Sequence, residues 1–408
     1  MNRSVGPRVF VLDALGRMPE EVPLAQACEQ AGMWATATRA TPAAAATWPL
    51  LTAALRAQGA AAVLVMADAS ASAPAAAPAA APTAAAAAAP APAATSAPAP
   101  PCHWLDAAHA RGWVVPQAGG DLDADRLAAA WQAQLARGHV PADAALLAWP
   151  AMPWLSWVGS PSGMSPPPVS ARCDTDPPLG LYAIAGDAAA LRRVLQAGVR
   201  TVQLRIKRPV DADAAWTAAL RQAVRDSLAA ADGHGALLFI NDHWRLAAEL
   251  GARAVHLGQE DLLALDERGH AELRASGLGL GVSSHAVWEL CRARSLAPQY
   301  IACGPVWPTT TKDMPWQPQG LDNLAWWCHV AGAPVVAIGG ILTPEQVRQT
   351  AAAGASGVCV LRGLGSDPQL TVAALQQAFE QGRQAALADA GQPVGQMHAT
   401  LGPAGLST

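Results

Sequence analysis

The chain has 408 residues, of which 52% are hydrophobic, and its formal net charge of −4 excludes the large basic face that nucleic-acid binding requires. Prolines interrupt the alanine-rich tract, so no apolar run reaches the about 18 residues of a membrane span, and the start of the chain lacks the pattern of a secretory signal. The seven scattered cysteines contain no CxxC pair and favour a reducing compartment. We therefore expect a cytoplasmic protein whose partners are neither nucleic acids nor membranes.

The first part of the chain is predicted to hold a smaller α/β-like region of unknown fold in two pieces, 1–68 and 102–158. The runs "RVFVL" and "AAVLVMA" have the apolar content of strands, and "DADRLAAAWQAQLARG" has the periodicity of an amphipathic helix. Residues 69–101 are almost entirely Ala, Pro, Ser and Thr, which predicts a flexible linker, because such a segment cannot offset its own ordering entropy. A second linker, rich in Pro and Ser, is predicted at 159–178. Neither of the two α/β-like pieces, 1–68 and 102–158, carries an active-site motif.

Residues 179–390 have a regular pattern of alternating strands and helices. Residues 391–408 come after it and are interpreted as a tail. Apolar runs of strand length begin at Leu179, Thr201, Ala236, Ala254, Leu278, Tyr300, Pro334 and Gly357, with mostly helical patterns between them. Such strands are buried on both faces, as in a parallel sheet, and eight strand–helix units predict a (β/α)8 TIM barrel. An open doubly wound sheet is the alternative, but no GxGxxG turn follows the first strand.

Polar residues lie where these strands end, which is the catalytic face of a barrel of this kind. They are Gln203, Arg205 and Lys207; Asn241 and Asp242; Gln259, Glu260 and Asp261; Ser283, Ser284 and His285; the segment 309–312; Gly339 and Gly340; and Arg362 and Gly363. Lys207 and Lys312 are the only lysines in the chain, although it has 27 basic residues. Keeping a compact ammonium at two strand ends favours phosphate binding over a structural salt bridge.

Asp242 and Asp261 follow neighbouring strands, so their carboxylates are expected to lie close together and to repel unless a cation separates them. Mg2+ commonly binds one or two carboxylates together with substrate phosphates, which makes these residues the predicted metal ligands, with Glu260 as the alternative. The competing interpretation of Asp242 is a helix cap, because "NDHWRLAAEL" resembles a helix start.

The loop after the sixth strand combines the hydroxyls of Thr309 and Thr311 with the charge of Lys312, which indicates a phosphate-binding loop. Gly340 allows close approach of the backbone to a ligand, at a position where such barrels commonly bind phosphate. His256 and His285 are candidate bases, although histidines at such positions are more often structural. Cys303 and Cys359 lie inside strands and are interpreted as small core residues.

Six segments of this region resemble the sequence motifs of a known family. "VQLRIK", "FINDHWRLAAELGARAVHLGQEDL", "GLGVSSHAVWEL", "YIACGPVWPTTTK", "PVVAIGGILTPEQV" and "AAAGASGVCVL" occur in the order found in thiamine-phosphate synthases, and the resemblance extends from about Leu179 to Ala386. It implies a TIM barrel that couples hydroxymethylpyrimidine diphosphate to a thiazole phosphate with Mg2+, releasing diphosphate in a dissociative reaction.

The resemblance also implies roles for individual residues. Arg205, Lys207 and Lys312 would stabilise the leaving diphosphate, and Asp242 and Asp261 would bind Mg2+. The pyrimidine diphosphate would be held by Gln203, Arg205, Lys207, Asn241, Ser283 and Lys312; the thiazole phosphate would be held by Thr309, Thr311, Gly340 and the backbone at Leu361 and Arg362. The chain departs from the family pattern in three places: at Ile206, usually acidic; at one additional residue in "GGILTPEQV"; and at Arg362, often serine.

Two other functions remain open. One is a thiazole tautomerase-like barrel, which does not need the complete diphosphate and metal set, and the other is a non-catalytic protein that binds thiamine precursors. The segment "DADRLAAAWQAQLARGHVPADAALLA" is weakly similar to the last helices of hydroxymethylpyrimidine phosphate kinases, so the first region is a candidate remnant of such a kinase. Small-molecule substrates are the expected partners, and a homo-oligomer is possible.

Overall fold

The computed structural model describes residues 8–12, 20–31, 45–67, 102–117, 123–157, 178–310, 315–388 and 395–401. The chain divides into two compact units, the first comprising 1–135 and 144–166 and the second 136–143 and 167–408. The predicted linkers lie outside the described residues, except for Pro178. No helix in the described part of the chain has the length and hydropathy needed to span a membrane.

The first unit contains a six-stranded sheet in the order β2-β1-β3-β4-β5-β6, and every pair of neighbouring strands is antiparallel. The predicted strands "RVFVL" and "AAVLVMA" are confirmed as β1 and β3, and the predicted amphipathic helix is confirmed as α3. The elements that precede the barrel are β1 (Arg8–Leu12), β2 (Glu20–Val22), α1 (Leu24–Gln30), η2 (Ala45–Thr47), α2 (Trp48–Ala57), β3 (Ala62–Met66), β4 (His103–Ala107), β5 (Arg111–Val115), α3 (Ala124–Ala136), α4 (Pro141–Leu147) and β6 (Trp154–Ser156). The last residue of α3 and the first three residues of α4 belong to the second unit.

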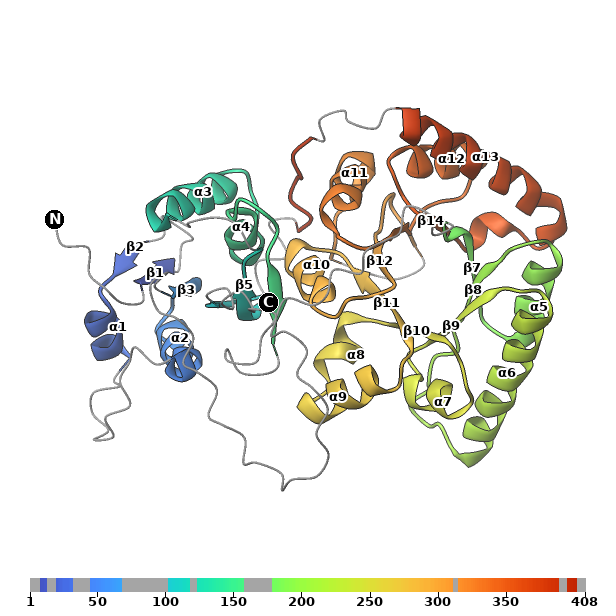
Figure 1. Cartoon of the computed structure of the whole chain (residues 1–408), viewed down its shortest axis with the longest axis horizontal. Coiled ribbons are helices and arrows are strands. Elements are labelled where there is room, and N and C mark those ends of the chain that lie inside the picture. Colours follow the sequence, from blue (N-terminus) through green and yellow to red (C-terminus); the bar gives the residue numbers. More distant parts are fainter. Residues whose placement is uncertain are drawn as a thin grey trace, which may run out of the picture. The chain divides into compact units, whose positions relative to one another are not determined.

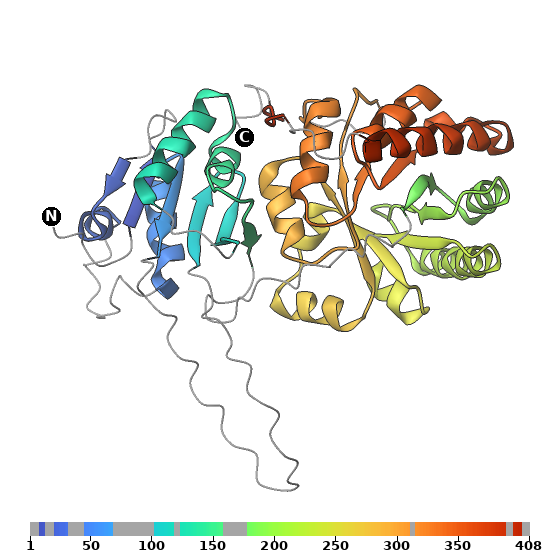
Figure 2. The ribbon, with the colours of Figure 1, turned by 45° about the horizontal axis from the view of Figure 1, so that its top comes forward.

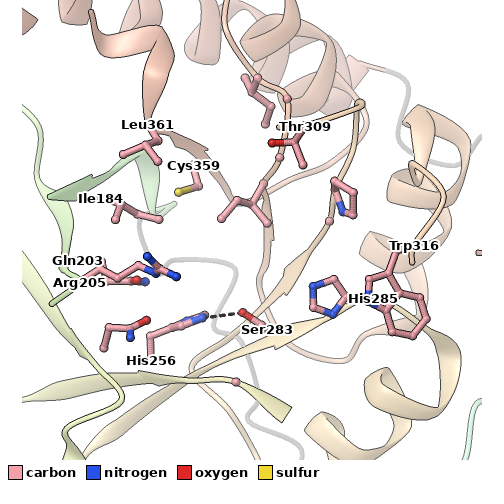
Figure 3. A pocket seen from close by; sticks show the side chains of 18 of the residues that line it. Ile184, Gln203, Arg205, His256, Ser283, His285, Thr309, Trp316, Cys359 and Leu361 are labelled. Carbon is pink, nitrogen blue, oxygen red and sulfur yellow. Dashed lines mark hydrogen bonds between the residues drawn. The ribbon is translucent and has the colours of Figure 1, made fainter. Parts of the chain in front are cut away.

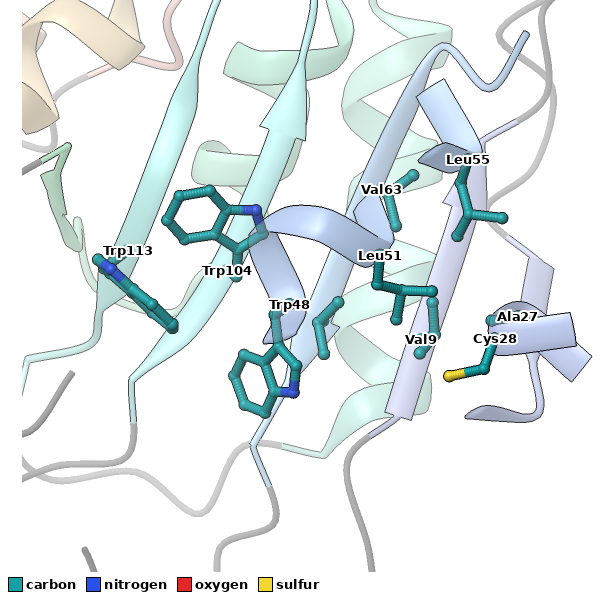
Figure 4. Close-up of a cluster of buried hydrophobic side chains, with 10 residues drawn as sticks. Val9, Ala27, Cys28, Trp48, Leu51, Leu55, Val63, Trp104 and Trp113 are labelled. Atoms are coloured by element: carbon teal, nitrogen blue, oxygen red, sulfur yellow. The ribbon is translucent and has the colours of Figure 1, made fainter. Parts of the chain in front are cut away.

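One face of this sheet packs against α1 and α2 (Figure 4). Leu51 and Leu55 of α2 pack over the valines of β1 and β3, while Trp48 contacts Trp113 of β5 with ring centroids 5.9 Å apart. Buried aromatic and branched side chains of this kind supply most of the burial energy of a small unit. The first unit therefore has a hydrophobic core of its own.

The second unit is a closed barrel of eight parallel strands, β7 to β14 in chain order, with helices on its outside (Figures 1 and 2). Its elements are β7 (Gly180–Ala185), α5 (Ala188–Gln196), β8 (Thr201–Leu204), α6 (Ala214–Gly233), β9 (Leu237–Asn241), α7 (Trp244–Glu249), β10 (Ala254–Leu257), α8 (Gln259–Leu263), α9 (Glu267–Ala275), β11 (Gly279–Ser284), α10 (Val287–Arg294), β12 (Tyr300–Cys303), α11 (Gly320–Val330), β13 (Val335–Ala337), α12 (Pro344–Ala352), β14 (Gly357–Val360), η4 (Arg362–Leu364) and α13 (Pro368–Ala388).

The predicted TIM barrel is confirmed, and each of its strands falls within one of the eight apolar runs. Local signals set several helix starts: the Asp187 carboxylate accepts a hydrogen bond from the Ala190 N–H at 2.7 Å, and Asp213 caps α6 in the same way. The barrel interior is filled by side chains such as Phe239, Tyr300 and Val336, so the barrel is a packed core below an open mouth.

Candidate active site

A cavity of about 480 Å3 opens at the carboxyl ends of the barrel strands (Figure 3). Its size is that of a pocket for a small molecule. Nearly all the predicted site residues line it, from seven different strands or the loops that follow them: Gln203, Arg205, Lys207, Asn241, Asp242, Asp261, Ser283, Thr309, Gly340, Leu361 and Arg362. Thr311 and Lys312 lie outside the described residues. The structure thus brings together every predicted site residue that it describes.

The acidic part of the cavity is built around Asp242. Its side chain forms an ion pair with Lys207, with 2.6 Å between Lys207 Nζ and Asp242 Oδ2. Its backbone has a φ of 63°, a left-handed conformation that is uncommon outside glycine and often marks functional sites. The competing interpretation of Asp242 as a helix cap is wrong, because α7 begins after His243 and no side chain caps it.

Asp261 lies on the first turn of α8 and accepts a hydrogen bond from the Gly258 N–H at 2.9 Å, so it does cap its own helix. Burial raises the pKa of the Asp261 carboxyl, and the negative charge of Asp242 raises it further. In the described part of the chain, no group of three or more His, Cys, Asp and Glu side chains is arranged to hold a metal ion. Two repelling carboxylates at the cavity still suit Mg2+, which commonly takes its other ligands from water and substrate.

The side-chain amide of Asn241 also lines the cavity. Asn241 ends β9 and is 4% exposed, and its Nδ2 has no hydrogen-bond partner among the described residues. A buried amide without a partner costs free energy, because its lost hydration is not replaced. The donor is therefore available to a molecule bound in the cavity.

A chain of buried hydrogen bonds connects two other cavity residues, Gln203 and Ser283, below the cavity floor. Gln203 Nε2 donates to Tyr182 Oη at 3.0 Å, and the two tyrosine hydroxyls are 2.9 Å apart. Tyr300 Oη lies 2.6 Å from His256 Nδ1, and His256 Nε2 lies 2.7 Å from Ser283 Oγ (Figure 3). Both tyrosines and His256 are buried.

The direction of these bonds depends on the tautomer of His256. Burial lowers the pKa of His256 to about 4, so the imidazole is neutral at pH 7 and carries one N–H. With Gln203 donating to Tyr182, one tautomer of His256 has Tyr182 donating to Tyr300, Tyr300 to His256 Nδ1 and His256 Nε2–H to Ser283. In the other tautomer these three bonds run in the opposite direction. His256 thus lines the cavity and bonds to Ser283, whereas the sequence analysis expected a histidine at this position to be more often structural.

Gly339 and Gly340 bring the loop after β13 against the loop after β12. Their φ angles are 93° and 73°, and a Cβ atom on Gly340 would lie 2.6 Å from Trp307 Cβ. Only glycine fits there without displacing its neighbour. Beyond β14, Arg362 Nη1 donates to Thr310 Oγ1 at 3.0 Å, so the arginine contacts the threonine-rich loop. The side of the cavity beside Thr309 is therefore lined by hydroxyl, backbone and guanidinium groups.

The remaining wall contains residues that the sequence interpretation missed. Glu289 and Trp316 both line the cavity, and His285 lies between them. The Glu289 carboxylate lies 3.0 Å from His285 Nδ1 and accepts a hydrogen bond from the His285 backbone N–H at 2.6 Å. The imidazole stacks on Trp316, with ring centroids 5.4 Å apart and planes 9° apart. Glu289 is the third residue of a helix and Trp316 is in an irregular segment, so neither follows the strand-end rule.

Ile206, which the sequence analysis identified as a departure from the expected acidic residue, contacts a neighbouring loop through its backbone. His243 Nε2 lies 2.8 Å from the Ile206 carbonyl oxygen, within hydrogen-bonding distance. This contact holds the segment between Arg205 and Lys207 without requiring a carboxylate at the intervening position.

Comparison with known proteins agrees with the geometry. The family model described as thiamine monophosphate synthase matches residues 181–364. A thiamine-phosphate synthase of Neisseria meningitidis serogroup A is 44% identical over 206 residues, which are 50% of this chain and 96% of the relative. The corresponding protein of Rhizobium etli is 43% identical over 46% of this chain and 87% of its own length, and that of Yersinia pestis is 42% identical over 50% and 93%.

Proposed function

Because the chain belongs to the thiamine-phosphate synthase family, we propose that its barrel couples a hydroxymethylpyrimidine diphosphate to a thiazole phosphate, giving thiamine phosphate and diphosphate. The chain is an enzyme of thiamine biosynthesis of this type. The observation that carries the finer proposal is that one cavity is lined by two groups of residues suited to anions, one with Arg205 and Lys207 and the other with Thr309, Gly340 and Arg362. Two phosphorylated substrates require two such regions within reach of each other.

The first region suits a diphosphate. Arg205 and Lys207 supply positive charge, and the orphaned Asn241 amide supplies a neutral donor. Gln203 and Ser283 lie at the two ends of the buried hydrogen-bond chain, which fixes their orientation and favours them as contacts of the pyrimidine ring. Lys312 would add a second ammonium, on the evidence of the sequence alone.

Asp242 and Asp261 are the proposed ligands of Mg2+. Their mutual repulsion, which Lys207 only partly offsets, fits a divalent cation. When bound, Mg2+ would neutralise charge on the diphosphate oxygens. The Lys207 ammonium, already 2.6 Å from Asp242, would then also be within reach of the same phosphate group.

The second region suits a monophosphate. The hydroxyl of Thr309, the glycine backbone at Gly340 and the chain at Leu361 and Arg362 border it. Anchoring the thiazole through its phosphate would hold the ring nitrogen in line with the pyrimidine methylene carbon, which reduces the entropic cost of the encounter.

The proposed reaction is dissociative. The bond between the methylene carbon and the diphosphate oxygen breaks, the oxygen retains the electron pair, and the thiazole nitrogen donates its lone pair to the resulting pyrimidine cation. The task of Arg205, Lys207 and Lys312 is to stabilise the charge that develops on the leaving oxygen, where one positioned donor contributes about 10²- to 10³-fold in rate. No proton transfer is needed in the bond-forming step.

The test is to incubate the full-length chain with both substrates, with Mg2+ and with a chelator, and to measure thiamine phosphate and diphosphate by chromatography. The proposal predicts equal amounts of both products, and only with Mg2+. A tautomerase-like activity would instead rearrange a thiazole substrate in the absence of the pyrimidine. A non-catalytic protein would bind the substrates and form no product.

A further inference from the structure

The last described segment, residues 395–401, lies beyond the residues matched by the family and yet contacts the chain beside the cavity. The Gln317 N–H donates to the Thr400 carbonyl oxygen at 2.9 Å, and Trp316 and Leu401 form an isolated antiparallel bridge. The segment belongs to the second unit, and Met397 and Thr400 are buried, at 2% and 1% exposed.

His398 is the centre of a second set of bonds. Its backbone N–H donates to Asn323 Oδ1 at 2.8 Å, and its carbonyl oxygen accepts from Asn323 Nδ2 at 3.1 Å. Its ring Nε2 lies 2.9 Å from the Gln319 carbonyl oxygen. Gln319 and Asn323 are both completely buried. Buried amides bonded in this way are expensive to leave unpaired, so the segment is fixed to the start of α11.

The same amides lead directly to the cavity wall. Gln319 Nε2 donates to the His285 carbonyl oxygen at 2.7 Å, and Gln319 Oε1 accepts from Asn323 Nδ2 at 3.1 Å. The His285 ring stacks on Trp316, and both residues line the cavity (Figure 3). The bonds therefore connect His398 to a wall of the site through Asn323 and Gln319.

The segment also acts on the chain that carries the threonines. Thr309 lies between β12 and α11, and this connection is closed at its base by two backbone bonds, Gln319 N–H to Pro305 O at 2.7 Å and Gly320 N–H to Val306 O at 3.0 Å. Residues 395–401 hold the second half of the connection through Trp316, Gln317 and Gln319. The threonine-bearing connection is thus bonded directly to residues 395–401.

We propose that residues 395–401 are a C-terminal brace that positions the wall formed by His285 and Trp316 and the adjoining subsite for the thiazole phosphate. The brace residues are positioning residues and do not touch substrate. The inference rests on the proposed function only for the identity of the ligand in that subsite.

The first test replaces His398 by Ala in the full-length chain and measures the affinity for the thiazole phosphate by calorimetry. Loss of one ordinary hydrogen bond predicts an affinity about fivefold weaker. His329→Ala is the matched control, because this exposed histidine lies on α11 outside the network and should leave the affinity unchanged. Deuterium exchange of the 316–323 amides should be faster in His398→Ala, whereas a merely local role at His398 would leave the affinity intact.

The second test compares two deletion variants. One lacks residues 395–408, and the other lacks only residues 402–408. We expect at least tenfold weaker thiazole phosphate binding in the longer deletion, with a smaller effect on the pyrimidine diphosphate, and no change in the shorter one. If His398→Ala changes neither the deuterium exchange of the 316–323 amides nor the affinity for the thiazole phosphate, the brace proposal is refuted. This holds even if the longer deletion does not fold. Faster exchange with unchanged affinity overturns its link to the subsite. A wild-type chain that binds the thiazole phosphate but makes no product refutes the proposed reaction and leaves the brace supported or refuted by binding alone.

Discussion

Replacing Tyr300 by Phe removes one hydroxyl from the middle of the buried hydrogen-bond chain. It removes the hydrogen-bond partner that Tyr182 Oη and His256 Nδ1 share, and both residues are buried in the barrel. An unsatisfied buried group costs about 1–3 kcal/mol, so we expect a loss of about 2–6 kcal/mol in the free energy of unfolding. The hydrogen bond that fixes the His256 tautomer is also lost, so Ser283 is held less firmly, and the KM for the pyrimidine diphosphate should rise about tenfold.

Tyr182→Phe is the comparison variant. It leaves Tyr300 Oη bonded to His256 and removes chiefly the partner of the Gln203 amide, which borders the cavity. Thermal melts and steady-state kinetics of both variants test the reasoning. A Tyr300→Phe protein that melts like the wild type, or is no less stable than Tyr182→Phe, would refute the central role of Tyr300 in this hydrogen-bond chain.

The remaining predictions concern charge. Lys312→Ala should reduce turnover about 10²- to 10³-fold with an unchanged melt, and wild-type turnover would show that this lysine does not stabilise the leaving group. Asp242→Asn combined with Asp261→Asn should abolish activity together with its Mg2+ dependence, and an active double variant that still needs Mg2+ would place the metal elsewhere. Burial lowers the pKa of His103 to about 4, so between about pH 6.5 and 4 the unfolded chain binds a proton that the folded chain does not. The free energy of unfolding of the first unit should therefore fall as the pH drops through this window, by up to about 3 kcal/mol, and denaturant titrations of His103→Asn should lose this dependence.

The barrel could be predicted because its strands are buried on both faces and therefore appear as separate apolar runs between helical patterns. The antiparallel sheet of the first unit could not be predicted in the same way. Its strands β3 and β4 are neighbours, although the long Ala/Pro-rich tract lies between them in the sequence. No local turn signal indicates that pairing, because the contact is set by tertiary packing of residues such as Trp104 and Val65.

The site could be predicted where a polar residue ends a strand, since all strands end at the same face. Site residues that do not end a strand could not be predicted in this way. Tyr182 and Tyr300 lie inside strands and resemble ordinary core residues, and their role depends on which side chains meet across the barrel. Trp316, in the cavity wall, pairs with Leu401, which lies about 80 positions further along the chain. Neither segment has a sequence pattern that would predict this contact.

The central claim is that the barrel alone performs the coupling reaction, because every described candidate site residue lies at the end of a barrel strand or in the segment that follows it. The most direct test is to compare the full-length protein with a chain beginning near Asp174, by thermal melt and by steady-state formation of thiamine phosphate from both substrates. We predict that the shortened protein folds and retains coupling activity, with at most a modest loss of stability. A soluble, folded, shortened protein without activity would contradict the claim, because the first region would then contribute to the site.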